Sequence, residues 1–269
     1  LVVSLFFPIW FFIQGYLSPQ PDQDARGLLY ASAWLMPALF VGVPSLILVY
    51  WKTSLRETFA LRVPPLRYLA AGLFIGISAW APAHEVSVLQ QRILGTPEAV
   101  MRSAELLAAT LRAIPLVQGL LVLALVPACC EELLFRGFLL SGVGPAVGKW
   151  GGILLSAAIF GVFHFFVFRF TVTAGLGVVL GYLCWQSRSI FPGMMAHFIH
   201  NALGTLMVVY SESFEFLQNH DSQEADIKLS FLMVALVLFM LGLVLAAWRG
   251  PSREGLPLET LRETTTVPG

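Results

Sequence analysis

The sequence predicts an all-α protein, a polytopic transmembrane helical bundle of about eight helices. One observation behind this prediction is composition: the 269 residues are 57% hydrophobic and 12% charged, and the mean hydropathy is +0.78. A soluble domain is about 25% charged, and both a water-soluble globule and a disordered chain need far more charge than this sequence has. The other observation is that the apolar residues gather in runs of about 20, the length of a helix that crosses a bilayer.

The runs follow one another along the chain and are separated by short polar connections. The expected membrane helices lie at 1–17, 28–51, 68–89, 114–140, 149–168, 171–187, 191–210 and 229–248. A short amphipathic helix is expected near 97–112, at the membrane surface. The polar segment 211–226 is predicted to be a solvated connection. Residues 1–248 therefore form a single expected transmembrane domain, followed by a polar tail, 249–269, that is predicted to be disordered.

Several of these elements have a distinguishing local feature. The run 1–17 begins without Met and lacks the charged start and cleavage site of a signal peptide, so it is expected to be a first membrane helix in a piece of a longer chain. The run 28–51 ends in Tyr50 and Trp51, a pair typical of an aromatic anchor at the interface. The run 68–89 is interrupted by proline and is still long enough to span.

Charges in the connections predict the orientation. The 16 basic and 16 acidic residues cancel, so no basic excess indicates a nucleic-acid partner. With eight spans, both termini share one side with the connections 52–67, 141–149 and 188–190. That side has the larger share of basic residues, among them Lys52, Arg56, Arg62, Arg67, Lys149 and Arg188. The positive-inside rule therefore favours both termini in the cytoplasm.

A few polar residues lie inside the predicted spans, where a charge costs about 2.5–3.5 kcal/mol on insertion scales, and such residues are functional candidates. They are Glu131, Glu132 and Arg136 in the fourth span, His164 in the fifth, and His197, His200 and Asn201 in the seventh. Glu132 and Arg136 are four residues apart, so they share a helix face and are expected to pair. His197 and Asn201 have the same spacing. The sequence thus predicts one polar site built from three helices.

Such a set of side chains supports hydrolysis. A carboxylate and a neutral imidazole can hold and deprotonate a water, and a second histidine with an amide can donate hydrogen bonds to a developing oxyanion. Arg136 would keep one of the glutamates ionised and oriented, but the residues alone do not separate Glu131 from Glu132 as the base. The same side chains are also plausible ligands for a divalent metal such as zinc, although no HExxH motif is present.

Three motifs in this region resemble those of the CPBP family, also called Abi, the intramembrane proteases related to the type II CAAX prenyl endopeptidase. The motifs are Glu131-Glu132-x-x-x-Arg136, Phe160-x-x-x-His164 and His197-x-x-x-Asn201, and they span 131–201. The resemblance implies a bacterial, CAAX prenyl protease-like hydrolase that carries out intramembrane proteolysis of membrane-associated or lipidated peptides. It also implies that no metal or other cofactor is needed.

The resemblance implies a role for each motif residue. Glu131 would be the general base, with His164 as its partner on the catalytic water. His197 and Asn201 would form the oxyanion hole. The orienting residues would be Glu132 and Arg136.

The setting implied by the resemblance is the lipid bilayer of a bacterial inner membrane, with a permease as a candidate partner or fusion. Two other classes stay open. One is a non-catalytic protein of the same fold: a scaffold, a bacteriocin self-immunity factor or a transporter-associated subunit. The other is a proton-coupled transporter that uses Glu131 and Glu132 as a relay, although the inverted repeats expected of one are not visible in the sequence.

The depths of two site residues differ in this scheme. If the helix 149–168 enters from the cytoplasmic side, His164 lies about 22 Å along it, whereas His197 lies only about 9 Å along its own helix. Residues of one site should lie at similar depth. Several glycines between 142 and 152 leave the start of the fifth span open.

Overall fold

The computed structural model describes residues 25–164, 167–218 and 226–248, and the predicted span 1–17 and tail 249–269 lie outside them. The elements are α2 (Ala25–Met36), η1 (Pro37–Gly42), α3 (Val43–Tyr50), α4 (Leu55–Thr58), α5 (Leu66–Ser78), α6 (Trp80–Leu94), α7 (Glu98–Arg112), α8 (Leu116–Leu120), η2 (Leu121–Leu125), α9 (Val126–Glu132), η3 (Leu133–Leu140), α10 (Ser141–Val162), α11 (Val167–Ser187), α12 (Phe191–Val209), α13 (Ser211–Phe214), η4 (Glu215–Leu217) and α14 (Leu229–Ala247). Within these ranges the single β-type pairing is an isolated bridge between Gln218 and Ile227. The predicted all-α class is confirmed.

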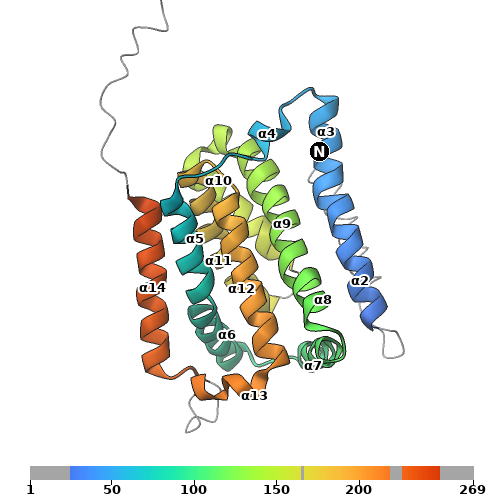
Figure 1. Ribbon diagram of the computed structural model, residues 1–269, viewed down its shortest axis with the longest axis vertical. Coiled ribbons are helices and arrows are strands. Elements are labelled where there is room, and N and C mark those ends of the chain that lie inside the picture. The colour runs from blue at the N-terminus through green and yellow to red at the C-terminus, as the bar shows by residue number, and fades with distance from the viewer. Residues whose placement is uncertain (1–24, 165–166, 219–225, 249–269) are drawn as a thin grey trace, which may run out of the picture.

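Among the residues that the structure describes, five segments are long and apolar enough to cross a membrane: Leu29–Tyr50, Leu66–Leu94, Leu116–Val162, Arg169–Ser187 and Leu229–Ala247. The helix α12, also 19 residues long, runs among them in the middle of the bundle (Figure 1). It carries the polar residues of the seventh predicted span, which lower its hydropathy. The protein is therefore an integral membrane protein with a helical bundle.

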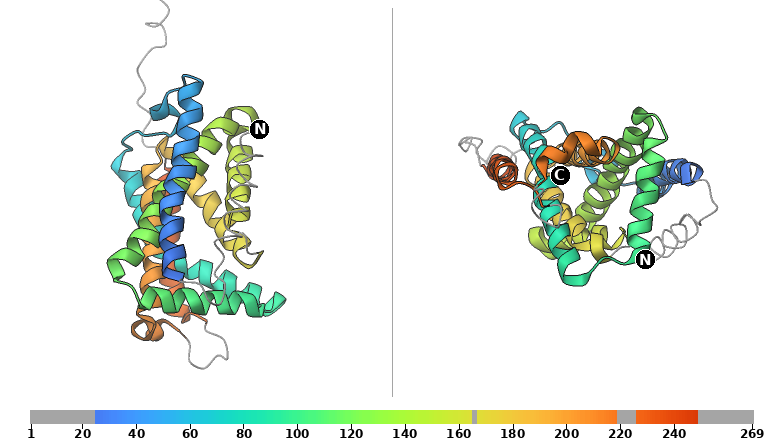
Figure 2. Two further views of the ribbon diagram at one scale, coloured as in Figure 1. Left: turned by 90° about the vertical axis from the view of Figure 1, so that its right-hand side faces the viewer. Right: turned by 90° about the horizontal axis from the view of Figure 1, so that it is seen from below.

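The helices stand in two layers. Figure 1 shows a row formed by α14, α5, α12, the continuous helix 116–140, and the α2–α3 helix. The pair α10 and α11 packs behind this row, against η3 and α12 (Figure 2). The predicted amphipathic helix is α7, which lies across one end of the bundle and buries only Thr110 and Leu111 (Figure 2).

Glycines let the helices of the row approach closely. A Cβ at Gly72 of α5 would lie 2.5 Å from the Pro192 carbonyl oxygen, and one at Gly76 would lie 2.9 Å from the Ala196 carbonyl oxygen. On α14, a Cβ at Gly242 would lie 3.0 Å from the Ala71 carbonyl oxygen. Small residues at such contacts allow backbones to touch, which is how helices associate inside a bilayer. The backbone of α12 is thus seated directly on α5.

The start of the fifth span agrees with the prediction. The range of α10 contains two helices joined by a kink at Gly148, whose φ of 76° and ψ of 176° are not helical, and the second helix begins at 149. The segment before the kink, predicted to be a connection, is helical. A positive φ is readily adopted only by glycine. The chain therefore turns at Gly148 at one end of the bundle before it runs inward (Figure 2).

The connections predicted to share one side of the membrane lie at the same end of the bundle. One end carries α4, the turn of α10, the α11–α12 connection and the C-terminal end of α14, and the other carries α7 and α13 (Figure 1). The connection predicted to be solvated, 211–226, is in part tied to α6. Arg92 holds both carboxylate oxygens of Asp226 at 2.7 Å, and the Ile227 amide donates to Glu85 Oε1 at 2.9 Å.

Candidate active site

The two adjacent glutamates lie at the end of α9, in the middle of the continuous helix 116–140. Glu131 is 8% exposed and Glu132 is fully buried. On either side of α9 the helix widens into π-helical turns, η2 and η3. Such turns shift the register of the side chains and are frequent at functional sites. Both glutamate side chains lie inside the bundle.

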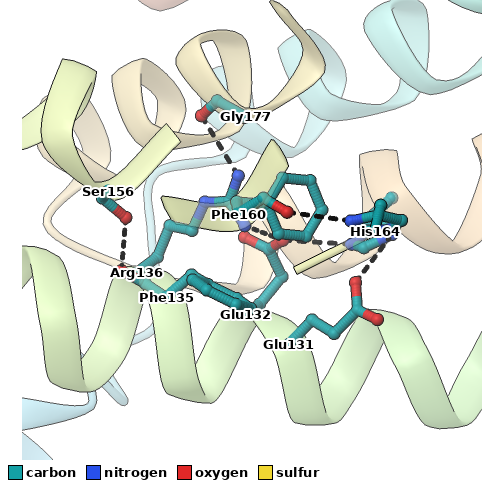
Figure 3. A network of polar contacts seen from close by, with 9 residues as sticks. Glu131, Glu132, Phe135, Arg136, Ser156, Phe160, His164 and Gly177 are labelled. Atoms are coloured by element: carbon teal, nitrogen blue, oxygen red, sulfur yellow. Dashed lines mark hydrogen bonds and ion pairs between the residues drawn. The ribbon is translucent and has the colours of Figure 1, made fainter. Parts of the chain in front are cut away.

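Glu132 pairs with Arg136, as its spacing predicts. Its Oε1 accepts a hydrogen bond from Arg136 Nη1 at 2.9 Å, and both side chains are fully buried (Figure 3). Arg136 Nη2 donates to the Gly177 carbonyl of α11 at 3.1 Å, and the guanidinium carbon lies 4.4 Å from the centre of the Phe160 ring. The cation therefore neutralises a buried carboxylate and links η3 to α10 and α11.

His197 lies between the two glutamates. Its Nδ1 is 3.0 Å from Glu132 Oε1, and its Nε2 is 3.7 Å from Glu131 Oε2. An ionised carboxylate can only accept, so Nδ1 carries the hydrogen of the shorter contact. The imidazole is 2% exposed. Its second nitrogen consequently faces Glu131.

His164 caps the end of its own helix. The His164 backbone amide donates to the Gly161 carbonyl. The Phe160 carbonyl oxygen instead contacts the His164 ring, at 2.9 Å from Nδ1. A carbonyl only accepts, so Nδ1 carries the hydrogen and Nε2 keeps a lone pair in the neutral ring. The ring is half-buried. The backbone of α10 thus selects the tautomer with a free acceptor.

The ring of Phe160 lies between the two histidines. Its centre is 4.7 Å from that of His164 and 5.9 Å from that of His197, both edge to face. The two histidines therefore belong to one cluster despite their different distances from the starts of their helices. Figure 3 shows Glu131 and His164 at the same end of the network, and in the described part no hydrogen bond joins these two side chains directly.

Asn201 lies one turn beyond His197 on the same face of α12. Its Nδ2 donates to the Leu123 carbonyl of η2 at 3.2 Å. An amide nitrogen has two hydrogens, so a second donor is left on Nδ2. The predicted shared face of His197 and Asn201 is present, and it faces the helix 116–140.

Two buried acceptors of the cluster are unsatisfied. Glu131 Oε2 and Glu132 Oε2 have no hydrogen-bond partner among the atoms that the structure places. Buried polar atoms are normally paired, so each unsatisfied one calls for an explanation. No group of three or more His, Cys, Asp or Glu side chains within the described ranges is arranged to hold a metal ion.

Sequence reasoning missed the backbone partners of the site. The carbonyl groups of Leu123, Phe160 and Gly177 leave no signal in a residue pattern. Gly193 was also missed, and a Cβ there would lie 3.0 Å from Glu132 Oε2. Its position four residues before His197, on the same helix face, is the signal that could have found it.

The fold and the cluster together define a class: an integral membrane protein with a buried glutamate, histidine and arginine network in the middle of a helical bundle. Residues 113–203 match the family model described as type II CAAX prenyl endopeptidase Rce1-like. This segment begins before η2 and ends after Asn201, so it contains every residue of the predicted site. The resemblance predicted from the three motifs is confirmed over this segment. No curated protein and no solved structure matches the chain.

Proposed function

We propose that the protein is an intramembrane endopeptidase that hydrolyses peptide bonds of membrane-associated or lipidated substrates. The observation that carries this proposal is the unsatisfied, buried Oε2 of Glu131, which lies in the Rce1-like segment beside His197. A buried carboxylate oxygen with no partner is suited to accept a hydrogen bond from a water molecule.

In this proposal Glu131 and His164 activate the water. His164 Nε2 carries a lone pair because Nδ1 is bound to the Phe160 carbonyl, so each of the two groups can accept one hydrogen of the water. The proton of the water passes to Glu131 as its oxygen bonds to the substrate carbonyl carbon. General-base assistance of this kind contributes about 10²–10⁴-fold to a rate.

The expected oxyanion hole consists of His197 and Asn201. Asn201 supports this role because one of its two amide hydrogens is not used by Leu123. His197, one turn earlier, can donate to the oxyanion when Nε2 is protonated. Glu132 contacts His197 Nδ1 and pairs with Arg136, so these two residues would orient the His197 ring. The chemistry proposed is independent of a metal, and the setting proposed is a bacterial inner membrane with both chain ends in the cytoplasm.

The test is a cleavage assay in detergent on a panel of lipidated and transmembrane peptides. Glu131→Gln and His164→Ala are expected to lower the rate at least about 10²-fold and to leave the protein folded. Glu105→Gln, at an exposed glutamate of α7, is the matched control and should cleave at the wild-type rate. Cleavage by Glu131→Gln at the wild-type rate would refute the assignment.

Two further outcomes separate the alternatives. Loss of activity on addition of a chelator, with recovery on zinc, would favour the metal-dependent form. A wild-type protein that folds and cleaves no peptide of the panel would favour the non-catalytic scaffold, immunity factor or transporter-associated subunit.

A further inference from the structure

The two glutamates hold the ring of His197 by different nitrogens and at different distances. Glu132 Oε1 contacts Nδ1 at 3.0 Å, a hydrogen bond, whereas Glu131 Oε2 lies 3.7 Å from Nε2, beyond hydrogen-bond reach. The ring is thus held firmly on the Glu132 side and loosely on the Glu131 side. The catalytic glutamate of the proposed mechanism faces the free nitrogen.

The charge on Glu132 is set by its surroundings. Its Oε1 accepts from Arg136 as well as from His197, and the guanidinium is fully buried beside it. A guanidinium has only donors, so the oxygen that faces it carries no hydrogen and acts as an acceptor. Glu132 can therefore only accept, and the hydrogen of neutral His197 lies on Nδ1. Nε2 then carries a lone pair and has no hydrogen to give to an oxyanion.

From this geometry we infer that Glu132 is a positioning residue that fixes the tautomer of His197, and that His197 Nε2 takes up the proton that Glu131 removes from water. The inference rests on the proposed function. The water loses one O–H bond and its oxygen bonds to the carbonyl carbon, while the proton moves from Glu131 to Nε2. The protonated Nε2 donates to the oxyanion and then gives the same proton to the leaving amine nitrogen as the C–N bond breaks.

The surroundings of the two histidines support a division of roles. A ring that accepts a proton becomes an imidazolium, which a carboxylate on its other nitrogen stabilises. His197 has such a partner in Glu132, whereas the Nδ1 of His164 contacts the neutral Phe160 carbonyl. His197 is therefore the better proton carrier, and His164 is the better fixed acceptor for water. The 3.7 Å gap to Glu131 is of the kind that tightens when a substrate binds.

The tautomer can be measured without a substrate. The chain has five histidines, so ring-labelled protein in detergent at neutral pH gives a small set of resonances, and His197→Gln identifies the signal of interest. The wild type should show a neutral ring with hydrogen on Nδ1. The double variant Glu132→Met/Arg136→Met removes this acceptor, leaves the Glu131 carboxylate, and should move the hydrogen to Nε2.

The outcomes separate the inference from the proposed function. If Nε2 of His197 carries a hydrogen in the wild type, in a neutral or a doubly protonated ring, the inference is overturned. An unchanged His197 tautomer in Glu132→Met/Arg136→Met would overturn it as well. Wild-type protein that cleaves no peptide while its tautomer behaves as expected would count against the proposed function alone.

A kinetic arm tests the charge of Glu132. In Glu132→Gln, Arg136 keeps the amide oxygen at the Oε1 position, so the tautomer should stay the same while the carboxylate charge is lost. The value of kcat should fall about 10²–10³-fold with KM within about threefold, while Glu105→Gln stays at the wild-type rate. An unchanged kcat in Glu132→Gln would contradict a proton on His197.

Discussion

The buried pair of Glu132 and Arg136 makes a quantitative prediction for stability. Replacing Arg136 by Met leaves a carboxylate with no exposed surface and no cation beside it. Breaking a buried pair in this way costs about 3–5 kcal/mol. Glu132→Met should cost less, about 2–3 kcal/mol, because Arg136 keeps the Gly177 carbonyl and the Phe160 ring.

The double variant should recover most of this loss. With both charges replaced by apolar side chains of similar length, no uncompensated charge is left, and such replacements are often close to neutral. A double-mutant cycle should therefore give a coupling energy of about 3 kcal/mol or more. Reversible unfolding in mixed micelles, followed by tryptophan fluorescence, measures it.

The exposed pair of Arg102 and Glu98 on α7 is the matched control. Its side chains are 74% and 72% exposed, so Arg102→Met should change the unfolding free energy by less than about 1 kcal/mol. A loss of under 1 kcal/mol for Arg136→Met, or a double variant in which the two losses add, would refute the reasoning that the buried charges compensate one another.

Two other predictions concern packing and the surface. Gly76→Ala should lower the unfolding free energy by about 1–3 kcal/mol, because the new Cβ would meet the Ala196 carbonyl at 2.9 Å, whereas Gly204→Ala, where no atom lies within 4 Å, should not destabilise. Arg92→Ala should cost less than about 1 kcal/mol in the same measurement, because Arg92 and its partner Asp226 are 39% and 27% exposed. Equal losses of unfolding free energy in Gly76→Ala and Gly204→Ala would contradict the close contact at Gly76. A loss of several kcal/mol in Arg92→Ala would contradict the weak contribution expected of an exposed ion pair.

The parts of the fold that the sequence predicts well are those encoded by runs of apolar residues. The predicted spans 191–210 and 229–248 coincide with α12 and α14 to within one residue, because hydropathy falls sharply where each helix ends. The span predicted to begin at 149 does so, but the residues before Gly148, predicted to be a connection, form a further piece of helix. The turn at Gly148 depends on a positive φ, which a hydropathy pattern does not record.

The site shows the same division. The contact between Glu132 and Arg136 follows from spacing along one helix, so sequence alone predicts it. The position of His197 between two glutamates depends on how α12 lies against α9, which no local pattern contains. The hydrogen bond of Asn201 to Leu123 depends in addition on the π-helical turn η2. The catalytic roles themselves stay predictions.

The glycine contacts of α5 have a mechanical consequence for the site. Where side chains separate two helices, a change of rotamer can absorb a small displacement of one helix. At Gly72 and Gly76 no side chain of α5 separates it from the backbone of α12. A movement of α5 is passed directly to the backbone that carries His197. On its other face α12 meets the helix 116–140 through side-chain contacts, including those of His197 and Asn201. The site can therefore deform more easily on the side of the glutamates, where His197 Nε2 and Glu131 Oε2 are 3.7 Å apart.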